Sequence, residues 1–287
     1  MRILLTGSSG RIGAAIGARL ALRHRVTGVD RRAGPMTTTI VDIRDTTRIA
    51  ALCRGIDAVV HTAALHVPDL ASHGEAEFQS VNVDATRRLL AACGEAGVRR
   101  FVYTSTTSLY GDSLLPADGA AVWVTESLPV RPRDAYDRTK LAAEEACRAA
   151  TGAGLACVSL RMSRCFPEDP RLVALYRLYR GVDAQDVAQA HELALTADLP
   201  AFEIFNISAR PPFQAADCRA LFTDAGSLLV DRFPWVRAEF ARRGWLLPQS
   251  IDRVYVVDKA IDRLGYRPVH DFCSLFSRRA TGPAQGG

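Results

Sequence analysis

The sequence has few cysteines, and they follow no recognisable pairing pattern. Seven are scattered over 287 residues, and none forms a Cys-x-x-Cys pair. Disulfide frameworks and cysteine-rich zinc sites usually show an even count or closely spaced pairs. The six histidines show no metal-ligand spacing either. We therefore expect reduced thiols, no metal site and a cytoplasmic protein.

Long apolar runs and clusters of one charge are also missing. No segment has 18 uninterrupted apolar residues, and the chain begins with a strand pattern instead of a signal-type stretch. Neither a membrane span nor export is therefore expected. The 36 Lys and Arg residues oppose 31 Asp and Glu, and the net charge of +5 is spread along the chain. A nucleic-acid-binding surface gathers its basic residues into a patch, so we expect no nucleic-acid partner.

What the sequence does contain is a regular alternation of strand and helix patterns. Strand patterns lie near 2–6, 25–29, 38–41, 57–60, 99–104 and 155–160, and helical patterns near 11–22, 45–53, 75–95 and 135–150. This alternation predicts an α/β fold with a doubly wound parallel sheet, the Rossmann arrangement. Residues 1–160 are expected to form a dinucleotide-binding domain. Residues 161–287, where prolines interrupt shorter elements, are expected to form a smaller substrate lobe that returns a strand at 202–207 to the sheet.

A glycine-rich turn follows the first predicted strand. Three glycines within residues 7–13 permit a tight turn and close approach of the backbone, and the helix that follows offers free N–H groups to a pyrophosphate. Asp30 ends the second predicted strand, where a carboxylate binds ribose hydroxyls and repels a 2′-phosphate. NAD is therefore expected and NADP is disfavoured, although Arg31 and Arg32 weaken this preference. The expected contacts of the turn are Gly7, Ser9, Gly10, Arg11, Ile12 and Gly13.

Tyr136 and Lys140 stand four positions apart in a predicted helix, so their side chains lie on one face. An ammonium beside a phenol stabilises the phenolate and lowers the pKa of the phenol toward the working range of a proton-transfer catalyst. The hydroxyl-rich residues 104–108 end an apolar strand, and ligands bind at strand ends in open α/β sheets. Tyr136 is thus predicted to move a proton while the neighbouring carbon exchanges hydride.

Taken in order, these motifs resemble the extended short-chain dehydrogenase/reductase family, also called the NAD-dependent epimerase/dehydratase family. The matching stretches are 6–13, 42–43, 61–64, 81–83, 101–111, 136–140, 186–188, 205–207 and 264–268. The resemblance implies a catalytic set of Thr106, Tyr136, Lys140 and Asn82, the last of these in a structural role. The remaining expected NAD contacts are Asp30, Arg31, Asp42, Ile43, Thr62, Ala63, Ala64, Thr104, Tyr136, Lys140 and Met162.

Departures from the family pattern reduce the range of substrates that we expect. Only 24 positions separate Arg161 from Asp186, where relatives that act on nucleotide-sugars carry a longer segment around the nucleotide. The Asp-Glu pair of sugar-nucleotide dehydratases is absent beside Thr106. Residues 165–167 are similar to the Cys-Phe-Pro stretch of uronate dehydrogenases, which implies an arginine that binds a substrate carboxylate. The candidates are Arg164, Arg171, Arg177 and Arg180, with Arg171 preferred. The expected substrate contacts are His66, Thr106, Thr107, Arg164, Cys165 and Arg171.

These patterns predict an NAD-dependent oxidoreductase that acts on a small sugar-like or sugar-acid substrate. An alternative is a sugar or nucleotide-sugar 4-epimerase with retained NAD, because oxidation and re-reduction would use the same residues. A third alternative is a cofactor-bound regulatory or scaffold protein without turnover. The intact Thr106, Tyr136 and Lys140 argue against this alternative. The helices at 75–95 and 135–150 have mixed apolar faces, and the resemblance implies that such helices pair in a homodimer.

Overall fold

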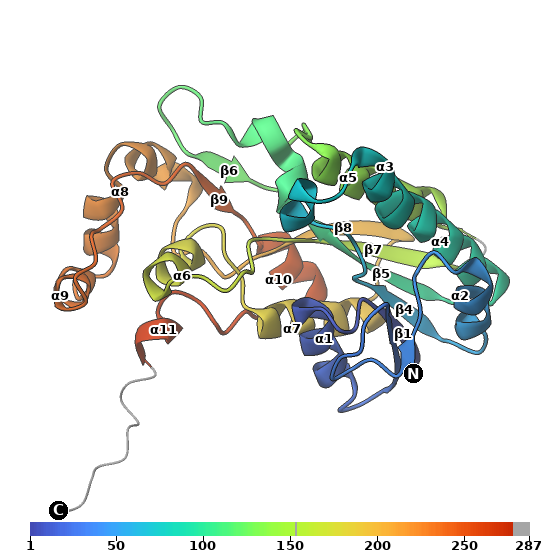
Figure 1. The fold of residues 1–287 in the computed structure, drawn as a ribbon. Coiled ribbons are helices and arrows are strands. Elements are labelled where there is room, and N and C mark those ends of the chain that lie inside the picture. The colour runs from blue at the N-terminus through green and yellow to red at the C-terminus, as the bar shows by residue number, and fades with distance from the viewer. Residues whose placement is uncertain (153, 278–287) are drawn as a thin grey trace, which may run out of the picture.

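The computed structural model describes residues 1–152 and 154–277. Its centre is a seven-stranded parallel sheet in the order β3-β2-β1-β4-β5-β7-β8 (Figure 1). The strands are β1 (Arg2–Thr6), β2 (Arg25–Asp30), β3 (Thr39–Ile40), β4 (Ala58–His61), β5 (Arg100–Thr106), β7 (Ala156–Met162) and β8 (Phe202–Ile207). The chain winds outward from β1 in both directions, so a crevice is expected at the carboxyl ends of β1 and β4. The predicted doubly wound sheet is confirmed.

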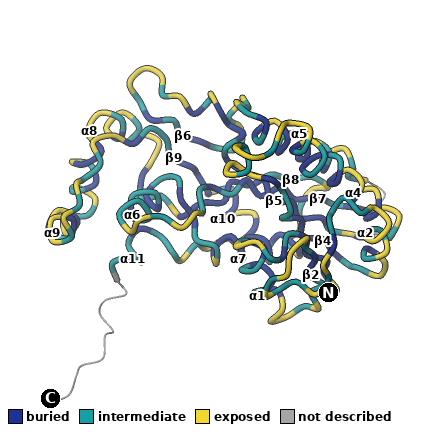
Figure 2. The backbone as a smooth tube through the Cα atoms, in the orientation of Figure 1, coloured by how far each residue is buried: buried dark blue, intermediate teal, exposed yellow. Residues whose placement is uncertain are grey.

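Helices cover both faces of this sheet (Figure 1). On one face lie α1 (Arg11–Leu20), α7 (Ala184–Thr196) and α10 (Asp258–Leu264), and on the other α2 (Thr46–Cys53), α4 (Ala85–Glu95) and α5 (Ala135–Ala149). The side chains of a strand alternate between faces. Ile3 and Leu5 therefore pack into the core beside α1, and Leu4 into the core beside α4. Figure 2 shows the strands as the buried centre between these layers.

The helix predicted over 75–95 is interrupted in the structure. After α3 (Glu75–Phe78) comes a π-helical stretch, Gln79–Asp84, before α4 begins. This wider turn contains the buried Asn82, whose Oδ1 accepts from the N–H of Leu65 at 2.8 Å and whose Nδ2 donates to the carbonyl of Leu65 at 3.0 Å. Asn82 Nδ2 also lies 3.1 Å from Thr139 Oγ1 on α5. These contacts join the segment after β4 to α5.

The chain after β7 contributes to two parts of the molecule. β8 pairs with β7, which confirms the strand predicted to return to the sheet. A lobe, at the left in Figure 1, contains α6 (Pro170–Arg177), α8 (Cys218–Arg232), α9 (Val236–Arg242) and α11 (Ser274–Ser277). Leu221, Leu229 and Phe240 belong to its separate apolar core.

A small parallel sheet, which the sequence did not predict, connects the two parts. It pairs β6 (Val122–Val124), from the segment after β5, with β9 (Arg253–Tyr255). It brings residues 253–255 beside residues 122–124, which lie far from them in the chain. In the part of the chain that the structure describes, no helix is long and apolar enough to cross a membrane.

Candidate active site

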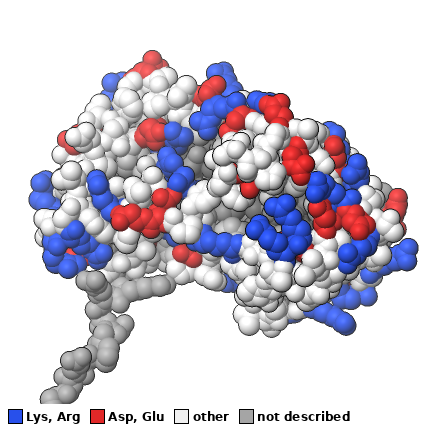
Figure 3. All heavy atoms as spheres, viewed as in Figure 1, with Lys and Arg blue, Asp and Glu red and all other residues white. Residues whose placement is uncertain are grey.

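A cleft of about 750 Å³ lies at the carboxyl ends of β1, β4 and β5. Figure 3 shows a hollow in the middle of the viewed face, with Lys and Arg side chains beside it. The predicted site residues that line the cleft are Gly7, Ser9, Gly10, Arg11, Ile12, Gly13, Asp30, Arg31, Asp42, Ile43, Thr62, Ala63, Ala64, His66, Thr104, Thr106, Thr107, Tyr136, Lys140, Met162, Arg164 and Cys165. Asn82 and Arg171 do not line it.

The glycine turn forms one wall of this cleft. Gly7 has φ +74°, and a Cβ there would lie 2.4 Å from Thr62 Oγ1. A Cβ on Gly13 would lie 2.0 Å from the carbonyl oxygen of Gly7, so neither position accepts a side chain. Gly10 precedes α1 and has no side chain to cap its first N–H groups. These uncapped N–H groups, with the positive end of the helix dipole, suit a pyrophosphate.

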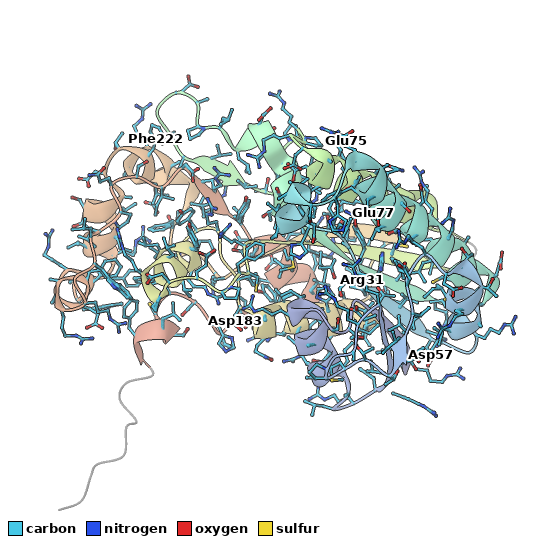
Figure 4. The ribbon with its side chains drawn as sticks, viewed as in Figure 1. Arg31, Asp57, Glu75, Glu77, Asp183 and Phe222 are labelled. Atoms are coloured by element: carbon cyan, nitrogen blue, oxygen red, sulfur yellow. The ribbon has the colours of Figure 1, made fainter. Side chains whose placement is uncertain are left out.

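The backbone fixes the orientation of the Asp30 carboxylate. The N–H of Ser9 donates to Oδ2 and the N–H of Arg32 to Oδ1, both at 3.1 Å. A carboxylate oxygen accepts more than one hydrogen bond, so each can also bind a ribose hydroxyl. The arrangement therefore fits the adenosine end of NAD. Figure 4 labels Arg31, which follows this carboxylate in the chain and also lines the cleft.

Asp42 is held by an ion pair. Arg44 Nη2 lies 2.7 Å from Asp42 Oδ2, and this hydrogen bond lowers the pKa of Asp42. The same guanidinium reaches Glu77 Oε1 at 2.9 Å, and Glu77 is labelled in Figure 4. These two ion pairs connect the segment after β3 to α3 beside the adenosine end of the cleft.

A hydroxyl, a phenol and an ammonium meet where β5 ends and α5 begins. The side chain of Thr106 lies beside that of Tyr136. Lys140 is 3% exposed, and its Nζ donates to the carbonyl oxygen of Thr104 at 2.6 Å. The same Nζ lies 4.2 Å from the centre of the Tyr103 ring. Burial lowers the pKa of Lys140 to about 7, so the ammonium and the amine are both populated near neutral pH.

The pKa of Tyr136 is raised, whereas the sequence predicted that it would be lowered. Burial raises it to about 12, because the phenolate loses more from desolvation than its interaction with Thr106 returns. Lys140 is directed to the Thr104 carbonyl and the Tyr103 ring, and it contributes no resolved lowering. The prediction that Lys140 lowers the pKa of Tyr136 is therefore wrong for the chain by itself. A positive charge beside the phenol would stabilise the phenolate.

A buried histidine on α7 orients Thr104. His191 Nδ1 lies 2.8 Å from the carbonyl oxygen of Val187, so it must carry the proton. His191 Nε2 then accepts from the hydroxyl of Thr104 at 2.8 Å. Burial lowers the pKa of His191 to about 4, and that of His61 on β4 to about 3. Both imidazoles are neutral at pH 7 and hold the strand ends through hydrogen bonds.

Besides Arg11, Arg31, Arg32 and Arg44, four further arginines line the cleft: Arg133, Arg164, Arg180 and Arg253. Three of them lie at ion-pair distance from acidic side chains: Arg133 from Asp137, Arg164 from Glu168 and Arg253 from Asp252. Arg180 instead packs on the Tyr176 ring, with 4.7 Å from its Cζ to the ring centre. Across residues 1–152 and 154–277, it has no acidic partner.

Arg171, the arginine preferred from the sequence, lies outside the cleft. Its backbone N–H donates to Asp169 at the start of α6, and its Nη2 lies 3.5 Å from the carbonyl oxygen of Leu246. Arg177 is mostly buried and pairs with Asp183, labelled in Figure 4, at 2.8 Å. The placement of both side chains disfavours them as substrate contacts. Arg164 and Arg180 are the two sequence candidates that reach the cleft.

The segment after β7 also faces the glycine turn. Arg11 donates to the carbonyl oxygen of Cys165 and lies 3.4 Å from its Sγ. The rings of His66 and Phe166 are 6.3 Å apart, and both residues line the cleft. Burial raises the pKa of Cys165, which leaves it a thiol at neutral pH.

Sequence reasoning missed several lining residues. Arg133 lies three positions before Tyr136, and this closeness could have indicated it. Arg253 and Tyr255 reach the cleft only because β9 pairs with β6, and no local signal in the sequence predicts that pairing.

Residues 3–171 match the model of the NAD dependent epimerase/dehydratase family. The match covers more than half of the chain, so the chain belongs to this family, and the resemblance seen in the sequence is confirmed. NAD, the cofactor in the family's description, is also the one that the Asp30 carboxylate and the glycine turn fit.

Relatives named as a dehydrogenase and as an epimerase match part of the chain. A 3-beta-hydroxysteroid dehydrogenase from Mycolicibacterium neoaurum is 36% identical over 50% of this chain and 42% of the relative. A UDP-glucose 4-epimerase from Corynebacterium glutamicum is 32% identical over 56% of this chain and 50% of the relative. The chain thus spans about half the length of these relatives.

Solved structures share the fold over nearly the whole chain. A short-chain dehydrogenase/reductase superfamily protein from Agrobacterium tumefaciens, with bound NAD, has a TM-score of 0.72 and 23% identity, and the match covers 98% of this chain and 96% of the other. A UDP-glucuronic acid 4-epimerase from Bacillus cereus, in complex with UDP-glucuronic acid and NAD, has a TM-score of 0.67 and 21% identity, covering 97% and 100%. At these identities the likeness establishes the fold alone.

We predict that the free energy of unfolding falls as the pH is lowered from 6.5 to 5. His61 and His191 have lowered pKa values in the folded chain, so the unfolded chain binds more protons in this range. Stability is therefore present above the ordinary histidine pKa near 6.5 and is lost below it, by up to about 1.4 kcal/mol per pH unit for each histidine. Urea unfolding at stepped pH measures the slope.

His191→Gln should remove the contribution of one histidine from this slope. The matched control is His73→Gln, a partly exposed histidine outside the cleft. An unchanged slope in the His191 variant would show that this imidazole is not held neutral.

Proposed function

We propose that the chain is an NAD-dependent oxidoreductase that transfers hydride between nicotinamide and a small sugar or sugar-acid substrate. The observation that carries this proposal is the convergence of Thr106, Tyr136 and Lys140 with the glycine turn on one cleft. Membership of an enzyme family supports turnover over a scaffold role. NAD, when bound, supplies the hydride acceptor and, in its oxidised form, a positive charge.

Each of the three side chains has its own role in this proposal. Thr106 orients the reacting oxygen, and Tyr136 takes its proton or returns one. Lys140, which lines the cleft beside Tyr136, binds the ribose of the nicotinamide side. Asn82 has an indirect, structural role, because its hydrogen bonds join the segment after β4 to α5. We assign the dinucleotide mainly to residues 1–160 and the far end of the substrate to the region from 161 onward.

The charge of the cleft supports an anionic substrate. Arg180 presents a guanidinium that has no acidic partner in the described chain, and such a group binds a carboxylate through two parallel hydrogen bonds. A steroid is a poorer fit, because its apolar skeleton would desolvate the arginines without binding them. The hydroxysteroid dehydrogenase relative is therefore a weaker guide to the substrate than the sugar-acting relatives.

The short stretch of chain between β7 and α7 supports a small substrate. The short segment between β7 and α7 forms α6, whose Ala174 packs into the core of the lobe, and it leaves no long wrapping segment for a nucleotide-sugar. A 4-epimerase with retained NAD is the second candidate, favoured by the similarity to UDP-glucose 4-epimerase.

We also propose a cytoplasmic homodimer. The buried Cys53, Cys93, Cys147 and Cys157 form no disulfide, which suits a reducing compartment. The α4 and α5 helices border a groove of about 650 Å³. Small residues in its lining include Ala91, Gly94, Ala146 and Ala149, and they would let the helices of a second copy approach closely.

Tyr136→Phe should lower kcat about 10²- to 10⁴-fold, since it removes the proton carrier and keeps the ring. NAD reduction is followed with sugar acids, free sugars, nucleotide-sugars and a 3β-hydroxysteroid. We expect turnover of sugar acids. Unchanged NAD binding and thermal stability in the variant serve as controls.

Undiminished turnover in Tyr136→Phe would contradict the assigned role, and a response confined to nucleotide-sugars or steroids would contradict the substrate class. Retained NAD with substrate epimerisation and no net NAD reduction would select the second candidate.

Arg180→Ala should raise KM for a sugar acid at least about tenfold, because a charge-assisted bidentate contact contributes roughly 1.5–3 kcal/mol. Turnover of the matching neutral sugar, measured as kcat/KM, should change little. The control is Arg219→Ala, which removes an exposed guanidinium on α8. Equal losses for the acid and the neutral sugar would argue against carboxylate binding by Arg180.

In light scattering, the chain should have twice its mass of 31.2 kDa. Ala91→Glu should yield monomers, because it places a charge in the α4–α5 groove where two copies would meet. Ala18→Glu, at an exposed position on α1, is the matched control and should remain a dimer. A monomeric unmodified chain would refute the proposed assembly.

A further inference from the structure

Tyr176, on α6, packs against two of the arginines that line the cleft. The Cζ atom of Arg180 lies 4.7 Å from the centre of the Tyr176 ring, and the Cζ atom of Arg164 lies 5.4 Å from the same centre. Both arginines line the cleft, whereas Tyr176 does not. One ring therefore holds two cations at the wall of the proposed substrate site.

The backbone keeps the same two arginines side by side. The N–H of Arg164 donates to the carbonyl oxygen of Arg180 at 3.0 Å, and the N–H of Val182 donates to the carbonyl oxygen of Arg164 at 2.9 Å. The carbonyl oxygen of Tyr176 accepts from the N–H groups of Arg180 at 2.8 Å and of Gly181 at 2.6 Å. These bonds join the end of α6 to the segment after β7, so the ring and the two arginines form one unit.

The two guanidiniums differ in how much of their hydrogen-bonding capacity is used. Nε of Arg164 donates to Oε1 of Glu168 at 2.7 Å, and Nη2 contacts the same oxygen. Nη1 of Arg164 takes no part in this ion pair. The guanidinium of Arg180 has no acidic partner within residues 1–152 and 154–277. Donors of both arginines are thus available to an anion.

Stacking on a ring explains how two guanidiniums are kept close together. The electron-rich face of the ring attracts each cation, and a guanidinium that packs on a ring keeps the N–H groups in its own plane free to donate. Phe166 adds a second ring, whose centre lies 5.1 Å from Cζ of Arg164. The rings therefore restrain the cations without using their donors.

The charges of this cluster, which consists of Arg164, Glu168, Tyr176 and Arg180, leave one positive charge in surplus. Glu168 balances Arg164, and Arg180 stays unbalanced. A carboxylate brings one negative charge, so neither partner would be left desolvated and unpaired. A phosphate monoester carries about two negative charges at neutral pH, and the second would lack a partner. The cluster therefore suits a carboxylate better than a phosphate.

We propose that Tyr176 is a positioning residue that holds Arg164 and Arg180 as a two-armed clamp for a single carboxylate of the substrate. Nη1 of Arg164 and the guanidinium of Arg180 are the donors. The inference rests on the proposed function, because it requires a sugar acid in the cleft. It adds the residue that sets the geometry of the clamp and the charge that the clamp accepts.

Binding of matched sugars tests the clamp without turnover. Glucuronate and galacturonate, the corresponding neutral sugars and their 6-phosphates are titrated calorimetrically into protein saturated with NADH, which cannot accept hydride. Tyr176→Leu should raise the Kd of the acid about three- to tenfold, because the arginines lose a cation–π contact. Binding of the neutral sugar should not change. Tyr176→Phe, which keeps the ring, should bind the acid like the wild type.

The matched control is Phe202→Leu. It removes a ring on β8 that lies 4.2 Å from Cζ of Arg148, outside the cleft, and should leave acid binding unchanged. Tyr176→Met, which also lacks a ring, takes the place of Tyr176→Leu if the leucine variant does not fold. Unaltered acid binding without the ring, or an equal loss for the acid and the neutral sugar, would overturn the proposal.

The second arm of the clamp has its own test. Arg164→Gln combined with Glu168→Gln removes one cation and one anion, so the net charge stays the same and only the donor is lost. The Kd of the acid should rise about tenfold, the effect of losing a hydrogen bond to a charged group. An unchanged Kd would leave Arg180 as a single arm and contradict the clamp.

The choice of anion separates the clamp from the proposed function. The acid should bind at least about tenfold more tightly than the matching 6-phosphate, and tighter binding of the 6-phosphate would overturn the inference. A wild type that binds neither acid would contradict the proposed function and the clamp together. Acid binding that is weakened by Arg180→Ala and not by Tyr176→Leu would overturn the clamp alone.

Discussion

The hydrogen bonds of Thr104 are the contacts on which the rest of the site depends. Its carbonyl accepts from Lys140 of α5, and its hydroxyl donates to His191 of α7, so one residue at the end of β5 joins the helix layers on both faces of the sheet. These bonds fix the register of α5 against β5 and thereby place Tyr136 beside Thr106. A parallel sheet collects such strand ends at one edge, which is why the glycine turn after β1 faces the same cleft.

Burial has opposite consequences for the two proposed catalytic groups. It lowers the pKa of Lys140 to about 7 and raises that of Tyr136 to about 12, because each loses the hydration of its charged form. In such a medium a single charge has a large effect. An oxidised nicotinamide, when bound, would supply a positive charge beside the phenol. Under the proposed function, proton transfer at Tyr136 therefore depends on an occupied cofactor site.

Features that depend on neighbouring residues were predictable from the sequence. The glycine turn lies within one strand–turn–helix unit, Asp30 ends one strand, and Tyr136 and Lys140 share one helix, so local pattern decides each of them. Features that depend on packing between distant segments could not be predicted from the sequence. Arg171 and Arg180 lie close together in the chain, and only the placement of α6 in the lobe turns the first away from the cleft. The place of Arg253 in the cleft depends on the β6–β9 pairing and could not be predicted from the sequence. The π-helical turn around Asn82 could not be predicted either. The pKa of Tyr136 was misjudged because the pattern shows spacing and not the depth of burial.

A crystal structure of the protein with bound NAD is the most direct test of these assignments. The pyrophosphate should lie at the glycine turn, one ribose on Asp30, and the other ribose within hydrogen-bond distance of Tyr136 Oη and Lys140 Nζ. The nicotinamide ring should then lie beside Thr106 with its reacting face open to Arg180. NAD bound with its nicotinamide away from Tyr136, or an α5 helix turned so that Lys140 leaves the cleft, would contradict the account.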